Sequence, residues 1–407
     1  MRARLLLVLV PVLGGTALAG GLVLPEPGPA ALGRAGAAAA IPDGPSAVYE
    51  NPAGLAIGRG LTLQAGVSIV NDRQALSAGG VTSRGAATTA TPDIFVAQRL
   101  GDHFAIGAGV RRAVAQSLEY PDAFPGRFTV QRASFGGTAL TFAAAGRPFS
   151  FLAIGFGLDV VFGDLDLAQA SGDARYETRR TFAGHAIGLG GVAALWARLY
   201  RDYLTLGVVY RSALDLDESG RLTTTLPGSA TPLAVEDGRL TLPMPHLLTF
   251  ALGSRPRPST SVQLEARLGL LRDLDGFTLK DTAEPAATLL AVPLPLRELV
   301  QLRLGAEQRL LGDRLALRLG VGYDLGAGRR DVSAALPDGD RVVVAAGLGY
   351  GRSDFSLDVG YLGAFSPGRT GSHGVAYPAS YTGARHTVGL SLSVRIAGFG
   401  TQPKRFD

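Results

Sequence analysis

The sequence predicts an all-β fold: a transmembrane antiparallel β-barrel of about 14 strands with an N-terminal plug, or hatch, inside its lumen. Three observations carry this prediction. The chain opens with an export leader, its later segments alternate strictly between apolar and polar side chains, and its connections alternate between short and long. The 407 residues contain no Cys, and one large barrel can occupy such a length.

The leader comes first in the chain. Arg2 and Arg4 precede an apolar run at residues 5–13, and an Ala-x-Ala site follows at residues 17–19. This order is typical of a secretory signal peptide, and the run is too short to favour the alternative of a membrane anchor. We therefore predict a signal peptide at residues 1–19, and a mature chain exported to the outer membrane of a Gram-negative bacterium.

After residue 58 the sequence adopts a period of two. In residues 61–69, Leu61, Leu63, Ala65, Val67 and Ile69 share one face, and polar or small residues occupy the other. The same alternation recurs at residues 262–270, 315–324 and 388–396. A soluble β-sandwich could also alternate. However, strands of roughly nine to eleven residues with a lipid-like face and a polar face suit a tilted crossing of the bilayer.

The connections distinguish the two folds. Short turns, such as residues 101–102, 200–202 and 312–314, alternate with long segments, such as residues 71–91, 164–178 and 215–239. Barrels have short periplasmic turns and long extracellular loops, so we predict a barrel over residues 59–396. The glycine-rich stretch at residues 188–200 could open a helix, but it lacks a βαβ context and is interpreted as a strand.

Residues 20–58 do not alternate. They are rich in Ala and Gly, and Pro42, Pro45 and Pro52 break them into short pieces. A barrel of this strand number leaves a lumen, so we predict that residues 20–58 form a compact hatch within it. A flexible periplasmic tail is the alternative.

The segment "DGPSAVYENPAGL", residues 43–55, resembles the hatch of the FadL/TodX-type outer-membrane transporters of long-chain fatty acids and hydrophobic compounds. Support comes from "FPGRF" at residues 124–128 and from similar strand and loop patterns at residues 241–256 and 336–361, in matching order. The tail at residues 397–407 departs from the family pattern, because these barrels commonly end on an aromatic residue of the last strand.

The resemblance implies a monomeric channel that captures apolar ligands with extracellular loops, holds them in a lumenal pocket and releases them sideways through the wall. It implies a kinked third strand beside the hatch, for which Gly107 and Gly109 are our candidates. The partners that it implies are fatty acids or aromatic hydrocarbons, outer-membrane lipid and lipopolysaccharide, and the barrel assembly machinery. The hatch residues that carry the resemblance and are predicted to gate the channel are Asp43, Asn51, Pro52, Ala53, Gly54 and Leu55.

Three arginines on predicted lumen faces, Arg267, Arg303 and Arg318, are candidates for attracting a fatty-acid carboxylate. The alternative, which we favour, is that they pair with carboxylates across strands, among Glu265, Glu307 and Asp324, and simply fill the lumen.

Other functions find little support. The net charge of +5 comes without any Lys/Arg-rich block, so we expect no nucleic-acid partner. The five His residues are scattered, and His373 beside Ser372 is a poor nucleophile–base pair, so we predict no enzyme, no cofactor and no metal. Carboxylates at residues 164–173 and 215–220 could bind Ca²⁺ or lipopolysaccharide phosphates, although solvated loop charge is the simpler interpretation. The alternatives to a channel for hydrophobic compounds are a general porin and, less well supported, an outer-membrane hydrolase.

Overall fold

The structure is a computed structural model that describes residues 28–78, 81–172, 176–201, 203–270, 274–296, 298–325, 334, 339–352, 354–370 and 379–396. The predicted signal peptide, the tail at residues 397–407 and His373 lie outside the described residues. Three short helices come first: α1 (Pro29–Leu32), α2 (Ala47–Glu50) and the 3-10 helix η1 (Pro52–Ile57). None of the helices in the described part is long and apolar enough to cross a membrane.

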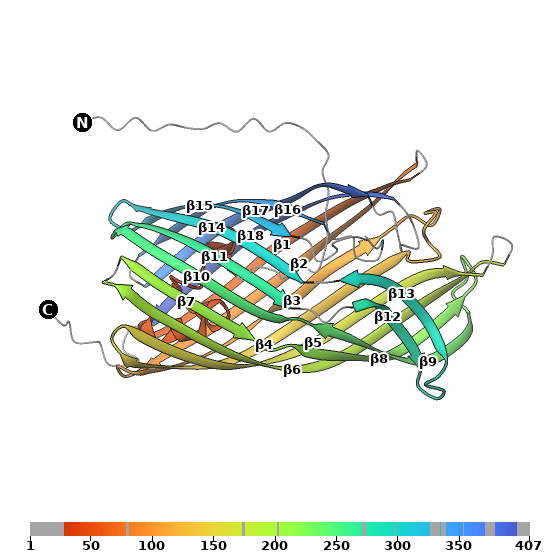
Figure 1. Ribbon diagram of the computed structural model, residues 1–407, viewed down its shortest axis with the longest axis horizontal. Coiled ribbons are helices and arrows are strands. Elements are labelled where there is room, and N and C mark those ends of the chain that lie inside the picture. Colours follow the sequence, from red (N-terminus) through yellow and green to blue (C-terminus); the bar gives the residue numbers. More distant parts are fainter. Residues whose placement is uncertain are drawn as a thin grey trace.

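Eighteen strand segments follow and form one antiparallel sheet. They are β1 (Leu61–Ala78), β2 (Val81–Leu100), β3 (Phe104–Glu119), β4 (Arg132–Phe149), β5 (Leu152–Ser171), β6 (Thr178–Tyr200), β7 (Leu204–Arg211), β8 (Leu214–Thr225), β9 (Pro232–Met244), β10 (His246–Arg257), β11 (Thr260–Leu270), β12 (Leu274–Asp281), β13 (Thr288–Leu296), β14 (Leu299–Leu310), β15 (Leu315–Leu325), β16 (Arg341–Gly351), β17 (Phe355–Thr370) and β18 (Ser380–Ile396). Because β1 pairs with both β2 and β18, the sheet closes into a barrel (Figure 1).

The eighteen segments make fourteen wall strands, as predicted, because four wall strands are each interrupted once. β7 continues into β8, β9 into β10, β11 into β12, and β13 into β14. The interruptions share one row of the sheet, since Arg211 at the end of β7 pairs with Leu247, Leu247 with Gly269, and Gly269 with Leu299. The ladder between the upper hairpins β8–β9 and β12–β13 is short: Lys280 pairs with Arg239 and Asp281 with Gly238, and the nitrogen of Thr282 donates to the carbonyl oxygen of Asp237 at 2.9 Å.

The strands are longer than predicted. Residues 71–91, expected to be a loop, are mostly strand, because β1 and β2 stay paired from Leu61 with Gln98 to Ala78 with Val81. Residues 164–178 and 215–239 also lie largely in strands. Above the lipid-facing part of the barrel the strands stay paired, although their residues are polar and rich in Thr and Gly. The end of the apolar face therefore does not mark the end of the strand. Residues 188–200 belong to β6, which confirms their interpretation as a strand.

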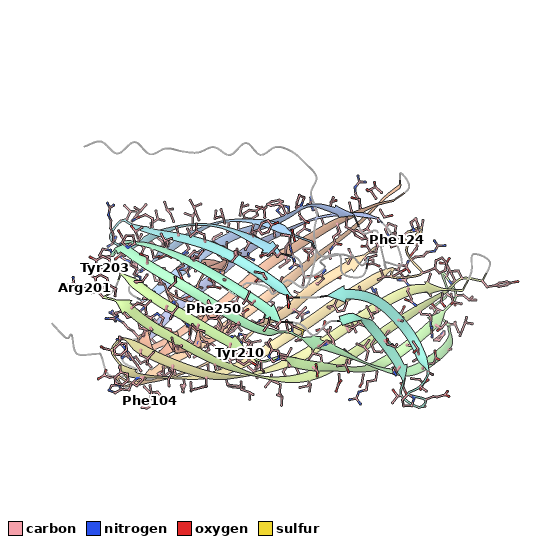
Figure 2. All side chains as sticks on the ribbon, in the orientation of Figure 1. Phe104, Phe124, Arg201, Tyr203, Tyr210 and Phe250 are labelled. Atoms are coloured by element: carbon pink, nitrogen blue, oxygen red, sulfur yellow. The ribbon has the colours of Figure 1, made fainter. Side chains whose placement is uncertain are left out.

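The two faces of the wall have the predicted polarity. On β1, Leu63, Val67 and Ile69 are exposed on the outside, whereas Gln64 and Ser68 are buried on the lumen side. Exposed aromatic residues gather at the end of the barrel that carries the short turns, where Figure 2 labels Phe104 and Tyr203. Short turns mark the periplasmic end, and aromatic residues are typical of the membrane interface there.

The hatch lies inside the barrel at this periplasmic end (Figure 1). Ala35 and residues 37–40 are almost fully buried against the wall. The wall makes room with glycines: a Cβ on Gly207 would lie 2.2 Å from the carbonyl oxygen of Ala39, and one on Gly155 would lie 2.4 Å from the nitrogen of Ala53. The backbones of hatch and wall therefore touch directly, which only glycine permits.

Candidate functional site

Asn51 ties the hatch both to itself and to the wall. The residue is completely buried, and its Oδ1 accepts a hydrogen bond from the backbone nitrogen of Ala53 at 3.1 Å, which caps η1. Its Nδ2 donates to the carbonyl oxygens of Ala39 at 2.8 Å and of Leu195 in β6 at 3.1 Å. A neutral amide is the side chain that can accept and donate in this way, so Asn51 locks the hatch onto β6.

The rest of the motif shapes the turn after Asn51. Pro52 takes the first position of η1, where its missing N–H costs nothing. A Cβ on Gly54 would lie only 2.3 Å from Cγ of Pro42, so the two hatch segments pack closely at this point. Leu55 is buried and faces the wall at Gly107.

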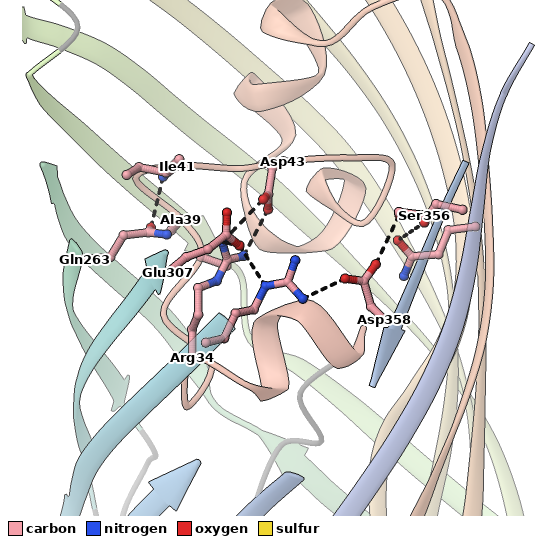
Figure 3. Close-up of polar contacts among 12 residues, drawn as sticks. Arg34, Ala39, Ile41, Asp43, Gln263, Glu307, Ser356 and Asp358 are labelled. Carbon is pink, nitrogen blue, oxygen red and sulfur yellow. Dashed lines mark hydrogen bonds and ion pairs between the residues drawn. The ribbon is translucent and has the colours of Figure 1, made fainter. Parts of the chain in front are cut away.

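Asp43 belongs to an ionic network between hatch and wall (Figure 3). Arg34 Nη2 lies 3.0 Å from Asp43 Oδ1, and Arg34 Nη1 lies 3.6 Å from Oε2 of Glu307 in β14. Arg309 Nε contacts Glu307 Oε1 at 2.7 Å, and its Nη2 lies 3.6 Å from Asp43 Oδ2. Arg34 is 1% exposed, and such a buried charge is tolerated only when it is paired.

Arg318 extends this network along the wall. Its Nε lies 2.7 Å from Glu307 Oε2, and its Nη1 lies 2.6 Å from Oδ1 of Asp358 in β17. The network thus contains three arginines (Arg34, Arg309 and Arg318) and three carboxylates (Asp43, Glu307 and Asp358). Within it, Arg318 links the neighbouring wall strands through its ion pairs. The hatch is consequently held by charges that balance one another rather than by apolar burial alone.

Glu265 and Gln263 of β11 hold the hatch backbone. Glu265 Oε2 accepts hydrogen bonds from the nitrogens of Ala38 and Ala39, both at 3.0 Å, and Gln263 Oε1 accepts from the nitrogen of Ile41 at 3.0 Å. Arg267 Nε pairs with Glu265 Oε1 at 2.7 Å. These bonds satisfy backbone nitrogens of the hatch, whose irregular chain takes no part in a β-sheet.

The three arginines predicted to attract a ligand carboxylate all have carboxylate partners in the protein. Arg267 pairs with Glu265, Arg318 with Glu307 and Asp358, and Arg303 of β14 forms an ion pair with Asp324 of β15. The geometry favours the alternative interpretation, with two differences: Arg267 and Glu265 lie on the same strand, and Arg318 also pairs with Asp358. A ligand role for these arginines remains an untested prediction that this geometry disfavours.

Tyr49 of α2 carries a contact that the sequence reasoning missed. The guanidinium carbons of Arg111 in β3 and Arg211 in β7 lie 3.8 and 4.5 Å from the centre of its ring. Arg211 Nη2 also donates to the carbonyl oxygen of Tyr49 at 2.6 Å, and Arg211 forms an ion pair with Asp159 of β5. Such cation–π contacts are strongest where water is excluded, and they attach α2 to the third wall strand.

The third wall strand parts from the second directly above this contact. β2 and β3 are in register from Leu100 with Phe104 only as far as Ile94 with Val110. Beyond that pair, β2 continues against β1 alone, and β3 continues against β4 as far as Glu119 with Arg132. A register shift between Arg112 and Val114 leaves Ala113 as an extra residue, which bends the strand as β-bulges do.

This corrects the predicted position of the kink. Gly107 and Gly109 lie in the regular part of β3, paired with both neighbours. Close packing explains why both positions are glycine. A Cβ on Gly107 would lie 2.6 Å from Cγ2 of Val48 in the hatch, and one on Gly109 would lie 2.3 Å from the ring of Phe95. An apolar-to-small alternation does not reveal a bulge, so the extra residue at Ala113 could not be predicted.

A large apolar cluster lies in the extracellular half of the lumen, beside buried polar side chains such as Gln74, Gln116 and Glu218. Within this cluster the rings of Phe135 in β4 and Phe277 in β12 lie 5.8 Å apart. Tyr120 and Phe124 stack at 4.3 Å in the segment after β3 and belong to the same cluster. Wall strands and an extracellular segment together thus form an interior suited to an apolar solute.

Three of the carboxylates that the sequence suggests for Ca²⁺ or lipopolysaccharide lie in strands and are paired with arginines. Asp164 lies 3.3 Å from Arg112, and Asp166 lies 2.8 Å from Arg132. Asp217 lies 3.5 Å from Arg239. No group of three or more potential metal-ligating side chains is present in the described part of the chain.

A closed wall of fourteen strands, apolar outside and polar inside, with a hatch in its lumen, defines an outer-membrane β-barrel transport protein of Gram-negative bacteria. The chain belongs to the family of outer membrane transport proteins described as OMPP1/FadL/TodX, whose sequence profile matches residues 10–391. This confirms the family suggested by the hatch motif, a family of channels for hydrophobic compounds and not of enzymes.

Individual relatives agree with this membership. Outer membrane protein P1 of Haemophilus influenzae is 24% identical over 400 residues, which cover 85% of this chain and 86% of that protein. The crystal structure of a Pseudomonas aeruginosa FadL homologue matches with a TM-score of 0.81 at 18% identity, over 92% of this chain and 99% of that one. The toluene transporter TodX of Pseudomonas putida matches with a TM-score of 0.75 at 16% identity, over 93% and 99%. At these identities the solved structures show the shared fold.

Proposed function

We propose that this protein takes up hydrophobic compounds, long-chain fatty acids or aromatic hydrocarbons, by passive transport, and releases them sideways into the membrane between β2 and β3. In this proposal the extracellular segments capture the solute and the apolar cluster in the extracellular half of the lumen holds it. The hatch then prevents it from continuing straight into the periplasm. The protein acts as a monomer, because one barrel contains the whole path.

The observation that carries the proposal is the loss of pairing between β2 and β3 above Ile94 and Val110. The separation is bounded, because the two strands approach again near Gly85, where a Cβ would lie 3.0 Å from the carbonyl oxygen of Glu119. Along this stretch β3 carries the small apolar residues Ala113, Val114 and Ala115, whereas β2 carries mainly small polar residues, among them Thr89, Thr91 and Asp93. The small apolar side chains on β3 support the proposal.

Sideways release is favourable for physical reasons. A solute that leaves for water loses about 25 cal/mol for each Å² of apolar surface that becomes wet. Release into the bilayer avoids this cost. The hatch supports the same direction, because its buried ionic network and backbone contacts block the axial path at the periplasmic end.

Deletion of Ala113 tests the proposal. Removing the extra residue restores regular alternation on β3, so that the strand can run straight beside β2 and close the separation. We expect uptake of radiolabelled long-chain fatty acid and of toluene to fall strongly in cells whose only such channel is this protein. Barrel assembly is checked by heat-modifiable migration on gels.

The matched control is deletion of Leu199, the extra residue at the register shift between Arg198 and Tyr200 on β6. This change also removes one residue at an irregularity, but at the periplasmic end of a different strand. Uptake should persist in this variant. Normal uptake by an assembled Ala113-deletion protein would show that the solute leaves by another route.

A further inference from the structure

Every wall strand that runs toward the periplasm ends with an arginine that lines one cavity. There are seven such strands, and in each the arginine lies within two residues of the strand end. They are Arg99 of β2, Arg147 of β4, Arg198 of β6, Arg255 of β10, Arg309 of β14, Arg352 after β16, and Arg395 of β18. We call these residues the arginine ring.

The cavity is a vestibule at the periplasmic mouth, with a volume of about 640 Å³. Among the described residues, its lining includes the arginine ring, Arg59, Arg314 and Arg318, but only four carboxylates: Asp43, Asp313, Asp354 and Asp358. The hatch forms its floor through Asp43, Gly44 and Pro45. The vestibule therefore opens to the periplasm, ends at the hatch and carries a large surplus of positive charge.

The ring arginines have unequal partners in the protein. Arg309 is neutralised by Glu307 and Asp43, and Arg99 donates to the carbonyl oxygens of Gly58, Gly101 and Asp102. By contrast, Arg255 and Arg352 are exposed and form no ion pair with any other described residue. Gathering like charges in a concave site is unfavourable unless an anion compensates them, and such a site concentrates anions from solution.

We propose that the arginine ring binds a soluble multivalent oxyanion, one that carries several phosphate or carboxylate groups. Guanidinium groups match both kinds of oxyanion with paired hydrogen bonds. One ligand with several oxyanion groups can span arginines from separate hairpins, which a single chloride ion cannot do. The site is distinct from the lumenal path for hydrophobic compounds, because the hatch separates the two.

The position of the ring argues for a soluble ligand and against a lipid headgroup. The arginines line the inside of the barrel, whereas the outer surface at the same turns carries exposed aromatic residues, among them Phe104, Phe149 and Tyr203. A phospholipid headgroup in the surrounding leaflet faces these rings and not the guanidinium groups. The ligand accordingly enters from the periplasm along the barrel axis.

Calorimetric titration of the full mature protein in nonionic detergent with sodium tripolyphosphate tests the proposal. We expect saturable binding that weakens steeply between low salt and about 1 M salt, because screening removes most of the attraction. The double variant Arg255→Gln/Arg352→Gln should weaken binding at least about tenfold, given the strength of charge-assisted hydrogen bonds. Both side chains are exposed, so the variant should assemble normally.

The matched control is Arg257→Gln, an exposed arginine two residues from Arg255 that does not line the vestibule. Its affinity should equal that of the unchanged protein. Absence of saturable binding, or an equal loss in the control and the double variant, would overturn the proposal. Repeating the titration in nanodiscs distinguishes the source: loss of tripolyphosphate binding when phosphatidylglycerol replaces a zwitterionic lipid would overturn a soluble ligand in favour of a headgroup.

Discussion

The two halves of the lumen are filled by different chemistry. The periplasmic half holds the hatch through directional contacts: the amide of Asn51, the carboxylate of Glu265, and the ion pairs of Arg34 and Glu307. The extracellular half contains a large apolar cluster that includes Phe135 and Phe277. Directional contacts fix one arrangement, whereas apolar contacts can be exchanged for those of a solute of similar character. The difference indicates that the hatch is fixed in one position at the periplasmic end, whereas the apolar cluster at the extracellular end can adapt to a solute.

Deleting residues 28–58 should have the largest effect, because it removes the hatch entirely. We expect a large, poorly selective conductance in planar bilayers, as in an open porin. The unchanged protein is the control and should conduct little. If the unchanged protein already conducted like an open pore, the periplasmic half would not be closed, and a general porin would be the better description.

Phe277→Ala tests the apolar cluster. Truncation of a buried Phe leaves a cavity and costs about 3–5 kcal/mol, so the midpoint of denaturant unfolding in detergent should fall clearly, together with the affinity for an apolar fluorescent probe. The control is Phe250→Ala on the outer surface, where 44% of the side chain is exposed and no interior cavity results. Equal losses in both variants would mean that the upper cluster is not a closely packed interior.

Asn51→Leu tests the directional half. The change removes three hydrogen bonds and leaves buried backbone groups of Ala39, Ala53 and Leu195 short of a partner, at about 1–3 kcal/mol each. We expect faster hydrogen exchange across the hatch and intermittent conductance. Asn71→Leu on β1 is the control, and its effect should stay within about 0.5 kcal/mol. An unaltered exchange rate in the Asn51 variant would show that this residue does not hold the hatch in place.

Glu50 adds a smaller, pH-dependent effect. Burial raises the pKa of this hatch carboxyl to about 8, although Arg34 acts in the opposite direction. The pKa of Glu50 is raised only while the hatch is docked in the barrel. The docked state is therefore most stable below the ordinary Glu pKa of about 4.5, and its stability declines as the pH rises toward 8. The protection factors of the hatch amides, which are exchange rates corrected for the intrinsic effect of pH, should therefore fall over this interval. Glu50→Gln should abolish the dependence, and a profile unchanged by this substitution would contradict it.

Much of the wall could be predicted, because lipid outside and water inside impose a period of two that is visible in residues 61–69 of β1. The hatch motif was equally informative, since Asn51, Pro52 and Gly54 are there for local reasons: a cap, a helix start and a close approach. Periodicity could not predict where the strands end, because paired strands continue above the membrane without an apolar face.

The partners of the hatch could not be predicted. Arg34 meets Glu307 across more than 270 residues of sequence, and nothing near Tyr49 indicates that Arg111 and Arg211 enclose its ring. The bulge at Ala113 is also silent in sequence, because it depends on the register with β4. By contrast, the arginine ring is visible in the sequence once the ends of the strands are known.

The interruptions in four neighbouring wall strands have a mechanical consequence. They fall on one row, and above it the ladder between β9 and the β12–β13 hairpin is short. His246 sits on this row, where its Nδ1 accepts from the nitrogen of Ala213 at 3.1 Å. The row is a mechanical boundary: a displacement of the upper hairpins above it would alter the bore of the outer mouth without breaking any ladder bond of the lower cylinder.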